Sequence, residues 1–169
     1  MPKERTPFFK DVPLKSNNVQ EQNEWVDSIF HSMSFEERLG QLFMVAAYSN
    51  KGNAHKEEIS KLIQEQNIGG LIFFQGGPVR QANMTNRFQA ESKIPLMVSI
   101  DAEWGLAMRL DSTISYPYQM ALGAIRQNEL LYDMGIHIGR QLRRAGVHVN
   151  FAPVVDVNNN PENPVINYR

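Results

Sequence analysis

The chain has 169 residues, of which 42% are hydrophobic and 21% charged, a composition that can bury the core of one globular domain or of a large part of one. Seventeen lysines and arginines against eighteen aspartates and glutamates leave a formal net charge of -1, so no overall field favours nucleic acid or an anionic bilayer as a partner. The absence of cysteine excludes disulfides, thiolate metal sites and a cysteine nucleophile.

The N-terminal part of the chain changes character near residue 24. Residues 1–23 contain Pro2, Pro7 and Pro13 without apolar periodicity, which predicts an extended arm. No apolar run approaches the roughly 20 residues of a membrane helix, and the first residues do not resemble a signal peptide. Further on, Ser-Phe-Glu-Glu at 34–37 is a capping box, which predicts a helix that begins at about Phe35.

Four short apolar runs then alternate with amphipathic segments. The runs are 42–47, 70–74, 94–101 and 147–157, and they lack the alternation of a half-exposed strand. The segments between them predict helices: one that ends at the glycines of 67–70, one that starts near Pro78, and one over 126–145. Strands that alternate with helices predict a parallel α/β sheet or barrel.

Polar residues follow each predicted strand, at the position where α/β barrels bind their ligands. They are Tyr48, Ser49, Gln75, Asp101, Glu103, Asn150 and Asp156. Hydroxyl, amide and carboxylate groups without a basic cluster fit a neutral polyhydroxylated ligand better than a nucleotide. The Gln-Gly-Gly at 75–77 lacks a phosphate-binding pattern and predicts a turn. His137 and His148 lack a second ligand at metal spacing, so no metal or cofactor is predicted, and His148 is expected to face the helix layer.

Three residues near the end of the third strand each have a structural and a functional interpretation. Asp101 could bind a ligand or cap a turn. Glu103 could be structural, either paired with Arg109 or solvated. Trp104 could stack on the apolar face of a sugar or pack within the fold. The residues alone leave these alternatives open.

Five segments, in order and spacing, resemble the first half of the catalytic barrel of glycoside hydrolase family 3, above all its β-N-acetylglucosaminidase branch. They are MSFEERLGQLFMV, NIGGLIFF, IPLMVSIDAEWG, YPYQMALGAI and GVHVNFAPVVDVNNNPENPVINYR. The resemblance implies that residues 24–169 form the N-terminal part of a TIM-type (β/α)8 barrel. It also implies retaining hydrolysis of β-linked N-acetylglucosaminides or glucosides, with export to the periplasm or the medium.

The resemblance also assigns roles to particular residues. It implies that Asp101 hydrogen-bonds sugar hydroxyls, that Arg169 helps to hold the same sugar, and that Glu103 and Trp104 adjoin this substrate site. One departure concerns the segment after the aspartate, where relatives commonly have Glu-Gly-Gly-Arg and this chain has Glu-Trp-Gly-Leu. Trp104 and Leu106 therefore change the pocket wall, and the usual arginine is missing there.

No catalytic residue is predicted within the chain. The Lys-His pair, the His-Asp acid/base loop and the aspartate nucleophile of the family belong to later strands. Asp101 and Glu103 are not expected to replace them.

Chain length agrees with this interpretation, since a TIM barrel takes about 250 residues and only four strands are expected here. The first and fourth strands would then have unpaired edges, which predicts self-association. The leading hypothesis is part of a glycosidase that is inactive by itself. The alternatives are a non-catalytic sugar-binding or assembly module, and a complete doubly wound protein, which the loop-like final residues disfavour.

Overall fold

The computed structural model describes residues 18–166 and divides into two compact units, one up to Leu39 and one from Gly40 onward. The first unit contains α1 (Val19–Ser32) and α2 (Phe35–Gly40), which ends at the boundary. The capping box is confirmed, since the Glu37 amide donates to the Ser34 hydroxyl at 3.2 Å and the Ser34 amide donates to the Glu37 carboxylate at 2.8 Å.

Helix α1 corrects the predicted extent of the extended arm. The Asn18 side chain accepts hydrogen bonds from the amides of Gln20 and Glu21, so the helix begins at Val19, four positions before the predicted end of the arm at residue 23. Residues 19–23 lack an apolar stripe, and the cap rather than hydrophobic periodicity starts the helix. The three prolines of the predicted arm lie outside the described residues.

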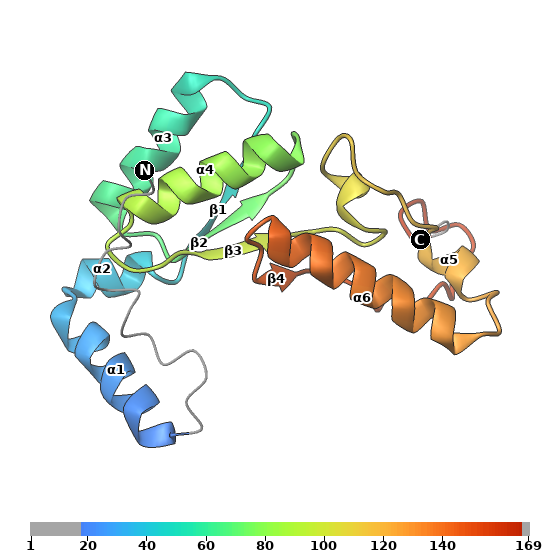
Figure 1. Ribbon diagram of the computed structural model, residues 1–169, viewed down its shortest axis with the longest axis horizontal. Helices are drawn as coiled ribbons and strands as arrows, with labels where there is room; N and C mark the ends of the chain where they lie inside the picture. The colour runs from blue at the N-terminus through green and yellow to red at the C-terminus, as the bar shows by residue number, and fades with distance from the viewer. Residues whose placement is uncertain (1–17, 167–169) are drawn as a thin grey trace. The chain divides into compact units, whose positions relative to one another are not determined.

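The second unit is built on a parallel sheet with the strand order β1-β2-β3-β4 (Figure 1). Its strands are β1 (Met44–Ala47), β2 (Gly70–Phe73), β3 (Met97–Ile100) and β4 (Val149–Asn150). Its helices are α3 (Asn53–Gln66), α4 (Pro78–Glu91), a short 3-10 helix (Leu106–Met108), α5 (Gln119–Leu122) and α6 (Asn128–Arg144). Every strand pairs with the next one along the chain, which is the arrangement predicted for a barrel of TIM type.

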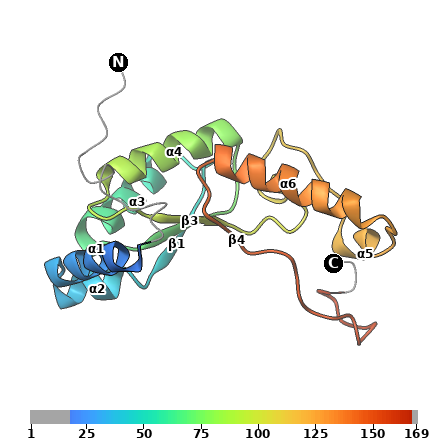
Figure 2. The same ribbon diagram turned by 60° about the horizontal axis from the view of Figure 1, so that its bottom comes forward.

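The core of this unit lies between the sheet and the helices α3 and α4, which lie side by side in both views (Figures 1 and 2). Apolar side chains from the strands meet the apolar faces of the two helices. The buried residues of these elements include Leu71, Phe73, Val98, Ile100, Ile59, Ile63, Met84 and Phe88. The prediction of strands separated by amphipathic helices is therefore confirmed.

Two of the predicted strands differ from expectation. Strand β1 is not buried on both faces, since Met44 is 36% exposed and Ala47 alone of its four residues is buried. Strand β4 has two residues instead of the predicted span 147–157, since it pairs only with Ser99 and Ile100 at the end of β3. An apolar run in the sequence does not reveal how far the neighbouring strand extends. Among the described helices, none has the length and apolar character needed to cross a membrane.

Candidate functional site

Asp101 follows the last residue of β3 and forms an ion pair with Arg109. Arg109 Nη2 donates to the Asp101 carboxylate at 2.5 Å, and Arg109 Nε donates to the Asp101 carbonyl at 2.8 Å. The side chains of Asp101 and Arg109 are 25% and 20% exposed, so both are partly accessible to a ligand. A guanidinium that bonds one residue twice fixes the orientation of its carboxylate.

A sharp turn between the two residues makes this ion pair possible. Gly105 has a φ of +85°, and a Cβ at this position would lie 2.6 Å from the ring of Tyr116. Glycine adopts such a φ without strain, and the 3-10 helix that follows carries Arg109 back to Asp101. Gly105, which stands where the Glu-Gly-Gly-Arg pattern also has a glycine, thus supplies the turn.

The interpretation of Glu103 as solvated is wrong, because the residue is only 6% exposed. Arg109, the partner predicted for a structural Glu103, forms its ion pair with Asp101 instead. The Glu103 carbonyl accepts a hydrogen bond from the Gln119 side chain at 3.2 Å, which connects this loop to α5. Glu103 is a buried residue of the loop behind Asp101.

Aromatic rings line the ends of the first two strands beside this ion pair. Tyr48 stacks on Phe74 with ring centroids 5.8 Å apart, and the Arg109 guanidinium lies 4.8 Å from the centre of the Phe74 ring. The Lys51 ammonium lies 3.9 Å from the centre of the Tyr48 ring. Phe74 and Arg109 are site residues that the sequence reasoning missed. Phe74 was counted as part of a strand, and the position of Arg109 depends on the turn at Gly105.

Two further predicted residues lie at the same edge of the sheet. Asn150 of β4 accepts a hydrogen bond from the Ala102 amide at 3.0 Å and donates to the Ala102 carbonyl at 3.3 Å. Trp104 packs edge-to-face against Tyr118 with ring centroids 4.5 Å apart. The Trp104 ring is therefore positioned by an aromatic neighbour, and Asn150 attaches the segment after β3 to the next strand.

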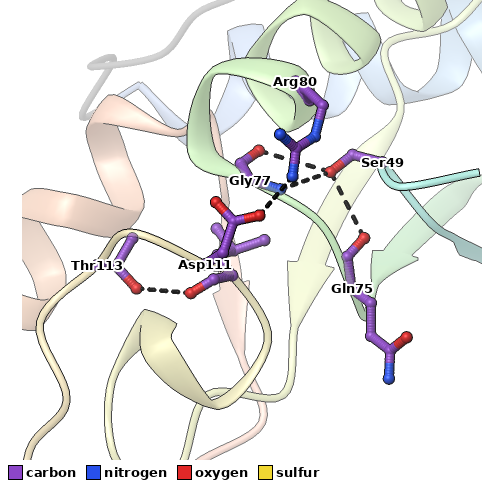
Figure 3. Close-up of polar contacts among 7 residues, drawn as sticks. Ser49, Gln75, Gly77, Arg80, Asp111 and Thr113 are labelled. Atoms are coloured by element: carbon purple, nitrogen blue, oxygen red, sulfur yellow. Dashed lines mark hydrogen bonds and ion pairs between the residues drawn. The ribbon is translucent and has the colours of Figure 1, made fainter.

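Ser49 connects the loops that follow β1 and β2 (Figure 3). Its hydroxyl accepts a hydrogen bond from the Gly77 amide at 3.1 Å and lies 3.5 Å from the Gln75 carbonyl. Nearby, Arg80 of α4 forms an ion pair with Asp111 at 2.5 Å. The predicted turn at 75–77 thus contacts both the loop after β1 and the segment that contains Asp111. Ser49, which is 3% exposed, has a structural role in these contacts.

The other predicted residues take no part in the ion pair of Asp101 and Arg109. The side chain of Gln75 and that of Asp156 are exposed, and Asp156 lies in a segment after β4 that forms no regular element. His148 Nδ1 accepts a hydrogen bond from the Val98 amide at 3.0 Å. Arg169 lies outside the described residues. Within residues 18–166, no three His, Asp or Glu side chains form a group that could hold a metal ion.

The arrangement offers hydrogen-bonding and stacking groups to a ligand. Asp101 presents carboxylate oxygens as acceptors, Arg109 presents guanidinium donors, and Tyr48 and Phe74 present ring surfaces next to them. Donors and acceptors beside aromatic rings suit a neutral ligand with hydroxyl groups and an apolar face. Retaining glycosidases place two carboxyl groups on either side of the bond that they cleave. The Asp101–Arg109 pair does not have this arrangement, because Asp101 is paired with a cation.

Parallel strands that alternate with helices, with polar groups at the carboxyl ends of the strands, define a domain of the TIM-barrel type. The sequence model of the glycosyl hydrolase family 3 N-terminal domain matches residues 34–169. The chain belongs to this family.

Relatives of known activity support the same assignment. The chain is 38% identical over 125 residues to β-hexosaminidase A of Pseudoalteromonas piscicida, a match that covers 66% of this chain and 21% of that protein. It is 40% identical over 144 residues to β-hexosaminidase LpqI of Mycobacterium tuberculosis, which covers 81% of this chain and 35% of that protein. The chain therefore spans between about a fifth and about a third of the length of these two relatives.

Solved structures share the fold. A family 3 β-N-acetylglucosaminidase from Paenibacillus sp. str. FPU-7 is 35% identical, with a TM-score of 0.68 over 79% of this chain and 26% of that one. The β-glucoside phosphorylase BglX bound to 2FGlc is 23% identical, with a TM-score of 0.80 over 94% of this chain and 28% of that one. The second likeness concerns the fold alone.

Proposed function

We propose that this chain forms the N-terminal part of a barrel that hydrolyses β-linked N-acetylglucosaminides or β-glucosides with retention of configuration. The observation that carries the proposal is the Asp101–Arg109 ion pair at the carboxyl end of β3, beside the stacked rings of Tyr48 and Phe74. Hexosaminidase relatives at 38% and 40% identity support this choice of substrate class. In this proposal residues 24–169 belong to the barrel domain.

Asp101 would accept hydrogen bonds from sugar hydroxyls, and Arg109 would keep the carboxylate in the orientation that accepts them. A carboxylate held by a guanidinium that also binds the backbone carbonyl of the same residue loses little further side-chain freedom when a ligand binds. Trp104 and the Tyr48–Phe74 pair would contact the apolar face of the sugar ring. Glu103 would support this loop from its buried position, and Arg169 would hold the same sugar from the far end of the chain.

The chemical step needs groups that the described residues do not bring together. Retaining hydrolysis uses a nucleophile and an acid/base group, with carboxyl groups about 5–5.5 Å apart in the usual arrangement. Asp101 is neutralised by Arg109, and Glu103 is buried behind it. We therefore expect this chain by itself to bind a sugar weakly and to hydrolyse no aryl N-acetyl-β-glucosaminide.

Calorimetry with N-acetylglucosamine and an assay with an aryl N-acetyl-β-glucosaminide test both parts of the proposal. Asp101→Ala should weaken the binding of the sugar at least about tenfold, because hydrogen bonds to a charged group contribute about 1.5–3 kcal/mol. Asp156→Ala, which removes an exposed carboxylate elsewhere, is the matched control and should bind like the parent chain. Hydrolysis that disappears in Asp101→Ala would show that the chemistry lies within these residues after all.

A sugar-binding or assembly module without catalysis is the second candidate. The pre-formed ion pair favours it, since the Asp101 carboxylate is oriented without the rest of a barrel. Under this alternative the chain binds N-acetylglucosamine tightly, whereas an incomplete catalytic pocket binds it weakly or not at all. The affinity measured by calorimetry therefore separates the two candidates.

We also propose that the protein acts in the periplasm or outside the cell, on the basis of its resemblance to exported family members. Fractionation of the source cells with an antibody against this chain tests the location. Recovery in the cytoplasmic fraction alone would overturn this part of the proposal.

A further inference from the structure

His55, in the first turn of α3, accepts a hydrogen bond from the backbone of Tyr48. The Tyr48 amide donates to His55 Nε2 at 3.1 Å, and the two rings meet edge to face with centroids 5.7 Å apart. The His55 side chain is only 11% exposed. One nearly buried imidazole therefore contacts both the backbone and the ring of Tyr48, a residue of the proposed sugar site.

The Tyr48 amide lies on the side of β1 that faces away from β2. Before it, the Ala47 carbonyl accepts from the Phe74 amide at 3.0 Å. After it, the Ser49 amide donates to the Gln75 carbonyl at 2.8 Å. These bonds run toward β2 and its loop, and successive amides of an extended chain point to opposite sides. The Tyr48 N–H thus points to the outer edge of β1, where the imidazole from α3 accepts it.

The strand register places Tyr48, Phe74 and Asp101 on one face of the sheet. The residues two positions earlier are paired across three strands, and they are Ala46, Ile72 and Ser99. Side chains two positions apart on a strand point to the same face. A displacement of the Tyr48 ring therefore affects the side of the sheet from which Asp101 would bind a sugar.

The hydrogen bond also defines which nitrogen of His55 carries the proton. A nitrogen of the imidazole ring accepts a hydrogen bond only when it is unprotonated. The proton of neutral His55 is therefore on Nδ1, which lies 3.7 Å from the Glu58 carboxylate. Protonation of Nε2 would place two N–H groups against each other at the 3.1 Å contact. The Tyr48 backbone would have to move, and its ring would leave the position where it stacks on Phe74.

Charges of both signs act on His55 from α3 and from the loop after β1. The Glu58 carboxylate favours a protonated imidazole, but its side chain is 72% exposed and water screens the attraction. The N-terminal end of α3 disfavours a cation in its first turn. The Lys51 ammonium, 3.9 Å from the centre of the Tyr48 ring, adds a second positive charge. The described contacts of His55 include no charged group of α4.

We propose that His55 is a positioning residue for the Tyr48–Phe74 ring pair and that its protonation weakens the binding of a sugar beside Asp101. This inference rests on the function proposed above. Neutral His55 holds Tyr48 against Phe74, so the ring pair is ready for a ligand. Protonated His55 releases Tyr48, and only a fraction of the molecules then has the binding arrangement, which lowers the apparent affinity by that fraction. Histidine is the side chain whose charge ordinarily changes between about pH 5 and 8.

Nuclear magnetic resonance of the full isotope-labelled chain tests the contact without a ligand. The imidazole nitrogens of His55 at pH 7.5 should show the proton on Nδ1. As the pH falls to 5, the amide signals of Tyr48 and Phe74 should shift with the midpoint of the His55 imidazole. His137, exposed on α6, is the control, and its titration should have no counterpart at Tyr48.

Titration with N-acetylglucosamine at pH 7.5 and pH 5 measures the effect on the site. The parent chain should bind about threefold to tenfold more weakly at pH 5, which corresponds to the loss of one hydrogen bond. His55→Gln should bind at both pH values like the parent at pH 7.5, because its amide oxygen accepts the same bond and does not titrate. His55→Leu should bind weakly at both values. His137→Gln should keep the pH profile of the parent.

Three results would overturn the inference. The first is a His55 proton on Nε2 at pH 7.5, and the second is Tyr48 signals that do not follow the His55 imidazole. The third is equal affinity of the parent at both pH values, or a pH dependence that survives in His55→Gln and so belongs to another group. Sugar binding with any of these results leaves the proposed function intact. If no sugar binds at any pH, the proposed function fails, and the shifts alone decide whether His55 positions Tyr48.

Discussion

Gly76, in the loop after β2, contacts the loop after β1 and the segment after the 3-10 helix. Its amide donates to the Arg109 carbonyl at 3.3 Å, and its carbonyl accepts from the Asp111 amide at 2.7 Å. Its φ is +143°, and a Cβ would lie 1.8 Å from the Ser49 hydroxyl oxygen. The backbone of Gly76 thus holds the segment that contains Arg109, at a position where only glycine fits.

We expect Gly76→Ala to lower the free energy of unfolding by about 3 kcal/mol, because an unfavourable φ costs roughly 1–3 kcal/mol and Ser49 must also move. The control is Gly135→Ala in α6, where the space around a Cβ is open and the conformation is helical. This control should raise the stability by about 1 kcal/mol. Urea unfolding of both variants measures the difference, and equal stabilities would contradict the role of Gly76.

At the level of single residues, sequence position identified Asp101 but not its partner. A carboxylate directly after a buried strand is visible in the sequence, because parallel strands end at one edge of a sheet. The contact with Arg109 depends on the turn at Gly105 and joins residues eight positions apart. Glu103 and Asp101 share a short segment, yet burial separates their roles, and burial follows from packing that a local pattern does not contain.

The helices α3 and α4 are joined by Arg87. Its guanidinium donates to Glu91 on its own helix at 2.6 Å, to Glu57 of α3 at 2.9 Å and to Ser60 of α3 at 3.1 Å. Burial is the largest single influence on Glu91 and opposes its charge. The hydrogen bonds from Arg87, Ser60 and Gln64 and the positive charge of Arg87 together outweigh burial and hold the pKa of Glu91 below its ordinary value. A carboxyl group with a lowered pKa stabilises the fold above its ordinary pKa and loses this contribution as the pH falls.

Glu91→Gln should therefore lower the stability at pH 7 by about 1 kcal/mol and reduce the loss of stability on acidification. The loss in the parent chain should begin near the ordinary value of 4.5 and continue through the lower pKa of the folded state. Glu65→Gln is the control, since its side chain is 56% exposed and lies 3.9 Å from Lys61. Thermal unfolding from pH 2 to 7 provides the measurement, and identical pH profiles for Glu91→Gln and the parent would refute this explanation.

At the level of elements, prediction succeeded where a local signal existed. The capping box defined the start of α2, and alternation of apolar runs with amphipathic segments defined the strands and helices of the second unit. The start of α1 was missed because Asn18 precedes residues without an apolar stripe. The length of β4 was overestimated, because a strand ends where its neighbour ends and that limit lies in β3.

The whole sheet has one open edge at β1 and one at β4 among the described strands. Leu42, just before β1, is 81% exposed, and Phe151, just after β4, is 53% exposed. Unpaired edges flanked by exposed apolar side chains favour pairing with another chain. We therefore propose that the isolated chain associates through these edges.

Light scattering at increasing concentration should show a mass at least twice that of the monomer. Leu42→Lys and Phe151→Lys should each raise the midpoint concentration of association about tenfold, since lysine beside an open edge disfavours pairing. Leu130→Lys on α6, which is 53% exposed, is the control and should not change the midpoint. A uniform monomer at every concentration would rule out this association.

At the scale of the whole molecule, the fold class and the strand order followed from the sequence, because each strand pairs with its successor and no distant connection has to be guessed. The sequence did not predict whether a further strand pairs with the outer edge of β1 or of β4, because the apolar pattern of a strand does not depend on the presence of such a neighbour.

The spacing of the paired strands also affects how the site is completed during folding. Partner residues in β1 and β2 are 26 positions apart and those in β2 and β3 are 27 apart, whereas those in β3 and β4 are 50 apart. Doubling the length of a closed loop costs about 0.6 kcal/mol of chain entropy. Strand β4 therefore requires the largest entropic cost of the three pairings and offers the shortest ladder in return. Asn150 can form its hydrogen bonds with Ala102 only when β4 pairs with β3. The loop that follows Asp101 is therefore fixed to the sheet by the pairing with the largest entropic cost.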